Sequence, residues 1–164
     1  MVRLISWNMA QRKTAWRFLT SSDADIALVQ EAREPSADVV GRLSIDAAAW
    51  HTGPYRAWRT AIVNISRRAE VQWLAAKLLP DAHAEELGVS RPGTLAAATI
   101  TPPTGEPFIA VSVYAPWEQS RSLTGRGFIY ADASVHRLIS DLSVSFPKIP
   151  SGLDSHRKAE SSHP

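Results

Sequence analysis

Three polar side chains stand at or near the ends of apolar, strand-like runs in this chain. Asn8 closes the run "LISWN", Glu31 closes "DIALVQE", and Tyr114 lies within "SVYAPW". A glutamate oxygen is a ligand of the type that Mg²⁺ prefers, usually together with phosphate oxygens and water. An asparagine amide can orient a phosphate or a carboxylate, and a tyrosine hydroxyl can donate to a phosphoryl oxygen where charge develops. Taken singly, each of the three residues is more typical of a turn or of a strand leaving its sheet.

Other residues with chemical potential have simpler explanations. His136 could act as a ligand or a base, but no second titratable partner lies near it in the sequence, so we interpret it as a surface or boundary residue of a helix. The six tryptophans, among them Trp50 and Trp58, could stack on bases or sugars. Packing in the core and at its boundary is the favoured use of such large rings.

The first third of the chain predicts a strand, a helix and a second strand. Residues 2–8 form a buried run, residues 11–22 space their apolar side chains as one helix face does, and residues 26–29 form another short apolar run. In α/β units ligands collect at the carboxyl ends of strands. The order of elements therefore predicts that Asn8 and Glu31 share one edge of a sheet.

The remainder of the sequence predicts more strands and one clear helix. "RTAIVNISRR" and "EVQWL" are expected to pair with each other, and "GTLAAATIT" and "PFIAVSVYAPW" to form a hairpin joined by "PPTGE". The stretch between these two pairs is expected to be a connection with one helical turn, and "VVGRLSIDAAAW" to hold a short helix. Apolar residues at i, i+3, i+4 and i+7 predict an amphipathic helix near the end of the chain: Val135, Leu138, Ile139 and Leu142.

Composition sets broad limits on the class of protein. The 164 residues suit one globular domain, with 45% hydrophobic and 21% charged residues. The formal net charge of +2 permits a polyanionic partner without arguing for one. The absence of cysteine excludes disulfides and thiolate metal sites. With no signal peptide or membrane-length apolar run visible, we expect a cytoplasmic protein that does not enter a membrane.

"LISWNMA", "DADIALVQEA" and "VSVYAPW", in this order, resemble the endonuclease/exonuclease/phosphatase (DNase I-like) superfamily. The resemblance covers about residues 2–145 and extends to the strand "RTAIVNISRR". It implies that Glu31 ligates a divalent metal, normally Mg²⁺ and alternatively Mn²⁺. It implies that Asn8 lies beside that metal as a ligand and phosphate holder, and that Tyr114 lies against the scissile phosphate. The implied reaction is metal-assisted hydrolysis of a phosphoester by water.

Two motifs that the resemblance requires are missing from this sequence. There is no Gly-Asp-x-Asn motif, whose aspartate orients the attacking water, and no Ser-Asp-His motif. The chain is therefore expected to be a truncated copy, weakly active or inactive as a Mg²⁺-dependent phosphodiesterase or nuclease-like hydrolase. The alternative is a non-catalytic remnant or binding module. The substrate class, which includes nucleic acid, stays open.

These observations together predict an α/β fold over residues 1–146 and a disordered tail over residues 147–164. The fold is expected to be a mainly antiparallel sheet flanked by helices, equivalent to the first half of a four-layer α/β/β/α sandwich. Helices over residues 10–20 and 129–145 would cover the same face of that sheet. The other face would then be apolar and uncovered, so self-association is expected.

Overall fold

The computed structural model describes residues 1–53, 56–79, 81–83, 86–115, 118–119, 128–129 and 137–143. The fold is mixed α/β with mostly antiparallel sheets, as the sequence predicts. The predicted tail over residues 147–164 lies outside the described residues. In chain order the elements are β1 (Leu4–Asn8), α1 (Ala15–Thr20), β2 (Ile26–Ala32), α2 (Ala37–Val40), β3 (Ser44–Ile45), β4 (Arg59–Asn64), β5 (Glu70–Trp73), β6 (Ala76–Leu78), β7 (Leu87–Val89), β8 (Leu95–Thr101), β9 (Phe108–Val113), β10 (Glu118–Gln119) and β11 (Phe128–Ile129), and residues 137–143 are helical.

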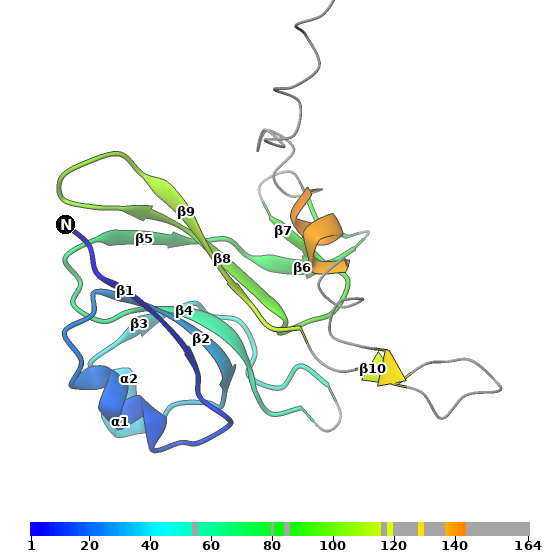
Figure 1. Cartoon of the computed structure of the whole chain (residues 1–164), viewed down its shortest axis with the longest axis horizontal. Coiled ribbons are helices and arrows are strands. Elements are labelled where there is room, and N and C mark those ends of the chain that lie inside the picture. The colour runs from blue at the N-terminus through cyan, green and yellow to red at the C-terminus, as the bar shows by residue number, and fades with distance from the viewer. Residues whose placement is uncertain are drawn as a thin grey trace, which may run out of the picture.

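The first sheet has four strands in the order β1-β2-β4-β3, with α1 and α2 on its outer face (Figure 1). β1 runs parallel to β2, and β4 runs antiparallel to both of its neighbours. A six-residue helix such as α1 is marginal alone, so its stability comes from packing. Trp16 and Leu19 of α1 are buried against Ala27, Val29 and Val63 of the sheet. Alternation along β2 and β4 thus sends one set of side chains to the helices.

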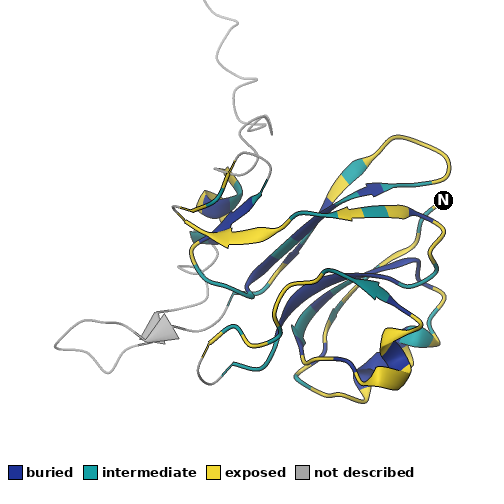
Figure 2. Cartoon of the chain, turned by 180° about the vertical axis from the view of Figure 1, so that it is seen from behind, coloured by how far each residue is buried: buried dark blue, intermediate teal, exposed yellow. Residues whose placement is uncertain are grey.

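The second sheet has three strands in the order β5-β8-β9, all antiparallel. It packs on the face of the first sheet that the helices leave open (Figures 1 and 2). Ile26 and Ile62 of the first sheet meet Ile100 of β8 in this second core. The indole nitrogen of Trp73 donates to the Ile62 carbonyl at 2.8 Å, so a hydrogen bond also joins the two layers. β2 and β4 are consequently buried on both faces.

Part of β8 has a further cover. β6 and β7 form a parallel pair, and the helical residues 137–143 lie beside β7 (Figure 1). Leu138 of that helix is buried with Leu87, Val89, Leu95 and Ala97. This third core lies on the face of β8 that points away from the first sheet.

Two of the predicted strand arrangements are wrong. β5 does not pair with β4, because β2 and β3 already occupy both edges of β4. Instead the chain crosses from one sheet to the other at Arg67, whose φ is +57°, and Asn64 closes the crossing by donating to the Ala69 carbonyl at 2.9 Å. The stretch expected to be a connection with one helical turn contains β6 and β7, whose three residues each are too few to show a period.

The expected arrangement of the layers also needs correction. The hairpin β8-β9 forms as predicted, but it belongs to a separate sheet, and its inner face is buried rather than uncovered. The two predicted helices do not share a face, because α1 packs on the first sheet and residues 137–143 pack on β7 and β8. Exposed apolar side chains lie instead on the outer face of β9, where Ile109 is 48% and Val113 39% exposed. Among the described residues, no helix is long and apolar enough to cross a membrane.

Candidate functional site

Asn8 and Glu31 are brought together by the parallel pairing of β1 and β2. Asn8 stands opposite Gln30 in the register, which places Glu31 one residue beyond the end of the ladder. The Asn8 side-chain nitrogen donates to Glu31 Oε1 at 3.0 Å, and the Asn8 side-chain oxygen accepts from the Ala10 N–H at 2.8 Å. The amide of Asn8 is therefore fixed at both ends and holds the Glu31 carboxylate in position.

The backbone around Glu31 is strained in a way that re-aims its side chain. Glu31 has a φ of +47°, and the pairing of β2 with β4 shifts between Val29 and Ala32. A bulge of this kind turns a side chain out of the regular alternation. Gln11, itself at a φ of +59°, donates its N–H to the Glu31 carbonyl at 2.9 Å and stabilises the bulge. Non-glycine residues in this region cost energy and cluster at functional sites.

Tyr114 reaches the same carboxylate from the second sheet. It follows β9, and its N–H donates to the Thr94 carbonyl at 2.9 Å. Burial raises the pKa of the Tyr114 hydroxyl above its ordinary value, and the charge of the Glu31 carboxylate, together with a hydrogen bond to it, raises it further. The ring lies edge-on to Trp58, with the ring centroids 4.9 Å apart. Asn8 and Tyr114 thus converge on Glu31, as the sequence predicts.

A polar link sets the distance between the two sheets at this end. Gln30 donates through Nε2 to the Ser112 hydroxyl at 3.1 Å and to the Leu28 carbonyl at 3.0 Å. Ser112 in turn donates to the Val29 carbonyl at 3.1 Å. Because Ser112 lies two residues before Tyr114, this link helps to position the tyrosine over Glu31. Sequence reasoning missed both residues, since partners 82 positions apart leave no local signal.

Two cationic side chains lie near Tyr114. Arg56 and Arg91 are close enough to lower the pKa of Tyr114, opposing the effect of Glu31. The Arg56 guanidinium lies over the Trp58 ring, 4.8 Å from its centroid. A site with one carboxylate and nearby guanidinium groups suits a ligand that carries a metal and an anionic group together.

The donor set limits what kind of metal site this can be. Within the described part of the chain, no group of three or more His, Cys, Asp or Glu side chains gathers, so a cage made of protein ligands alone is not formed there. Mg²⁺ commonly binds through one or two carboxylates and keeps several waters, which a single half-exposed Glu31 can satisfy. The amide of Asn8, engaged with Glu31 and Ala10, fits a positioning role better than that of a direct ligand.

The remaining sequence candidates have three different outcomes. His136 lies outside the described residues. Trp50 packs edge-on against Trp16 at 6.1 Å between ring centroids, and the Arg59 guanidinium stacks on its ring at 4.1 Å, so it has a packing role. Trp58, by contrast, is part of the site through Tyr114.

Comparison of the chain with protein-family models, with curated proteins and with solved structures finds no match.

Proposed function

We propose that the Glu31 site binds a divalent cation together with the phosphate group of a phosphoester. The observation that carries the proposal is the convergence of Asn8 and Tyr114 on one carboxylate, held at φ +47° where two sheets meet. Side chains from three separate segments contact one another at this point. Residues that served only to end a strand or form a turn would not need to meet in this way. The resemblance to the endonuclease/exonuclease/phosphatase superfamily supports the same assignment.

Each residue has a distinct role in this proposal. Glu31 supplies the carboxylate oxygen for Mg²⁺ or Mn²⁺, which when bound would polarise the phosphate oxygens. Asn8 keeps that carboxylate oriented through its 3.0 Å hydrogen bond. Tyr114 has a protonated hydroxyl, whose single proton is hydrogen-bonded to Glu31 and could be donated instead to a phosphate oxygen once a metal occupies that carboxylate. The guanidinium groups of Arg56 and Arg91 add attraction for an anion.

Turnover is a separate matter from binding. The sequence has neither the Gly-Asp-x-Asn nor the Ser-Asp-His motif, and general base catalysis is typically worth about 10²–10⁴-fold in rate. We therefore infer weak hydrolysis or none from this chain. The alternative, a module that binds the metal and the phosphoester without cleaving it, shares every contact described above.

Calorimetric titration with Mg²⁺ tests the proposal. The protein should bind Mg²⁺ with a dissociation constant of roughly 1 mM, since one carboxylate with retained waters makes a weak site. Glu31→Gln should abolish binding, whereas Glu34→Gln should not, because the exposed Glu34 carboxylate is a matched control three residues away. Equal binding by both variants would refute the site. Hydrolysis of bis-p-nitrophenyl phosphate, measured on the same samples, separates the enzyme from the binding module.

We also infer two features of the setting. The chain is proposed to act in the cytoplasm on a phosphoester substrate, and nucleic acid is one of the substrate classes left open. The exposed Ile109 and Val113 on the outer face of β9 support self-association through that face.

A further inference from the structure

β9 is an edge strand of the second sheet, and one side of its backbone has no partner among the residues that the structure describes. It pairs with β8 alone, and the Tyr114 N–H donates to the Thr94 carbonyl in the same register. Antiparallel strands exchange hydrogen bonds at every second residue pair, so the backbone groups of Ala110 and Ser112 also point toward β8. The N–H and C=O groups that point to the open side are therefore those of Ile109, Val111 and Val113.

The first sheet extends one strand beyond this open edge. β9 lies over β2, where the Ser112 hydroxyl donates to the Val29 carbonyl at 3.1 Å. β1 is the next strand of the first sheet, and its register with β2 turns Leu4 and Ser6 to the same side as Ile26, toward the second layer. Nothing in the described part of the chain buries them there, since Leu4 is 49% exposed and Ser6 is exposed as well. The open edge of β9 and the uncovered side of β1 thus form a step that is one strand wide, which we call the β1–β9 step.

The composition of β9 favours pairing along this edge. Edge strands usually carry charges, prolines or bulges that prevent pairing with another chain. β9 has none of these, because its sequence "FIAVSV" is uncharged and its register with β8 runs without a shift. By contrast β5, the opposite edge of the same sheet, carries the exposed Glu70 among only four residues. β9 is therefore the edge of this sheet that is open to a further strand.

A second copy of the chain does not fit the β1–β9 step through its own β9. Two β9 strands paired antiparallel about a twofold axis would place both first sheets on the same side of the joined sheet. The overhanging β1 of each copy would then lie under the β9 of the other, where β2 is already packed. What fits the step is a single extended segment without a second layer of its own.

We propose that the β1–β9 step binds one extended segment of a partner protein as an additional strand of the second sheet. The backbone of the segment would exchange hydrogen bonds with Ile109, Val111 and Val113, which is the mode of strand addition to an exposed sheet edge. Every second side chain of the segment would point toward β1 and cover Leu4, so apolar residues are expected at alternate positions. The added strand would continue the apolar interface that already joins the two sheets.

The step runs up to the proposed metal site without being part of it. β1 ends at Asn8 and β9 is followed by Tyr114, so one end of a bound strand would lie next to Glu31. None of the contacts that hold the strand involves the Glu31 carboxylate. Glu31→Gln should therefore bind a strand as the wild type does, and the two proposals fail separately.

The probe is the peptide acetyl-Lys-Thr-Val-Thr-Ile-Thr-Val-Thr-Lys-amide, which alternates apolar and small polar side chains between charged ends. In the protein alone, the amide protons of Ala110 and Ser112 should be protected from exchange with solvent, and those of Ile109, Val111 and Val113 should exchange rapidly. Adding the peptide should slow exchange at the latter group and shift their ¹⁵N-labelled amide resonances. The dissociation constant should be of the order of 0.1 mM, because a strand of this length makes a small interface. The same peptide with proline in place of its isoleucine should bind at least about tenfold more weakly.

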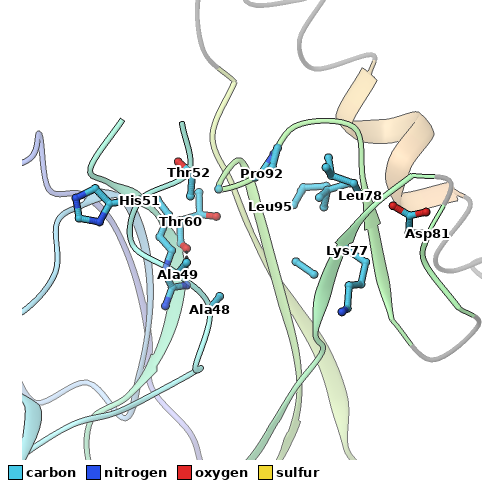
Figure 3. Close-up of a pocket in the computed structure, with 14 residues that line it drawn as sticks. Ala48, Ala49, His51, Thr52, Thr60, Lys77, Leu78, Asp81, Pro92 and Leu95 are labelled. Atoms are coloured by element: carbon cyan, nitrogen blue, oxygen red, sulfur yellow. Dashed lines mark hydrogen bonds between the residues drawn. The ribbon is translucent and has the colours of Figure 1, made fainter. Parts of the chain in front are cut away.

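Two variants with matched controls test the two sides of the step. Val111→Pro removes an outward N–H but no hydrogen bond to β8, so it should abolish peptide binding. Val71→Pro removes the outward N–H of β5 at the opposite edge and should leave binding unchanged. Leu4→Ser removes the apolar floor and should weaken binding about three- to tenfold. Leu78→Ser is its control, since Leu78 is 47% exposed on β6 and lines a cavity of about 420 Å³ that shares no residue with the step (Figure 3).

Three results would overturn the proposal. Protection of the Ile109, Val111 and Val113 amides in the protein alone would mean that the chain itself covers the edge. Protection that rises with protein concentration in the absence of peptide would mean that a second copy fills the step. The third result is a peptide that protects none of these amides, or that binds Val111→Pro and Leu4→Ser as it binds the wild type. If Val111→Pro does not fold, the comparison of Leu4→Ser with Leu78→Ser decides alone.

Discussion

Asp25 is a buried carboxylate that joins three segments at the end of the sheet opposite Glu31. Its side chain is 2% exposed and accepts from the Arg3 N–H at 2.9 Å and from the Ser66 hydroxyl, with the Arg68 guanidinium at 3.7 Å. Replacing Asp25 with Ala removes the acceptor for both donors. Each partly buried donor left unpaired costs about 1–2 kcal/mol, so the change should lower the free energy of unfolding by about 2–4 kcal/mol.

The same contacts predict a pH dependence. The pKa of Asp25 is lowered from its ordinary value of 3.8, mainly by the hydrogen bond from Ser66, then by that from Arg3. Because the folded pKa lies below the unfolded one, the stabilisation is complete above about pH 4 and is lost as the pH falls through the folded pKa. Asp25→Asn, which keeps the shape but not the charge, should therefore differ most from the wild type at neutral pH.

Urea unfolding from pH 7 to pH 2.5 measures both effects. Asp23→Asn is the matched control, since Asp23 is 84% exposed in its ion pair with Arg3, and such surface pairs contribute about 0–1 kcal/mol. The reasoning is refuted if Asp25→Ala costs no more than Asp23→Asn. It is refuted equally if the difference in unfolding free energy between the wild type and Asp25→Asn stays constant from pH 7 down to pH 2.5.

Three further changes have clear expected outcomes. Thr60→Val should leave the unfolding free energy unchanged or raise it by about 1 kcal/mol, because the buried hydroxyl it removes has no partner among the described residues; a loss above 1 kcal/mol in chemical denaturation would contradict this. Trp73→Phe should cost about 1–3 kcal/mol by the same measurement, since it leaves the Ile62 carbonyl between the sheets unpaired, and a loss below 0.5 kcal/mol would count against that role. Val113→Lys on the outer face of β9 should reduce self-association in light scattering, whereas a wild type that is already monomeric at tens of micromolar would contradict association through that face.

Local patterns in the sequence were sufficient to predict most of the individual strands. The runs that end at Asn8 and Glu31, the strand around Ile62 and the hairpin β8-β9 all have the length and apolar content of strands, and the structure forms them. The meeting of Asn8 with Glu31 also followed, because two neighbouring parallel strands must end at the same edge. Tyr114 reaches the same carboxylate from the second sheet.

The division of the strands between two sheets could not be predicted in the same way. An apolar side chain facing a helix and one facing a second sheet have the same period along a strand, so Val63 and Ile62 look alike in sequence although they enter different cores. Pairing of β5 with β8 also depends on both edges of β4 being occupied, which is a property of the whole sheet.

Parts of the site were hidden for a related reason. Ser112 and Trp58 matter through contacts with Gln30 and Tyr114, and none of these partners is a sequence neighbour. The role of the Asn8 amide depends on which group each of its ends contacts, so the structure favours positioning of Glu31 where the resemblance implied metal ligation.

The most direct test of a metal site at Glu31 is paramagnetic broadening by Mn²⁺ in the ¹⁵N NMR spectrum of the protein. At substoichiometric Mn²⁺ the amide resonances of Asn8, Glu31 and Tyr114 should broaden first, and an excess of Mg²⁺ should restore them. The same resonances should stay sharp in Glu31→Gln and broaden normally in Glu34→Gln. Broadening that centres on other carboxylates, or that persists unchanged in Glu31→Gln, would contradict the proposed site.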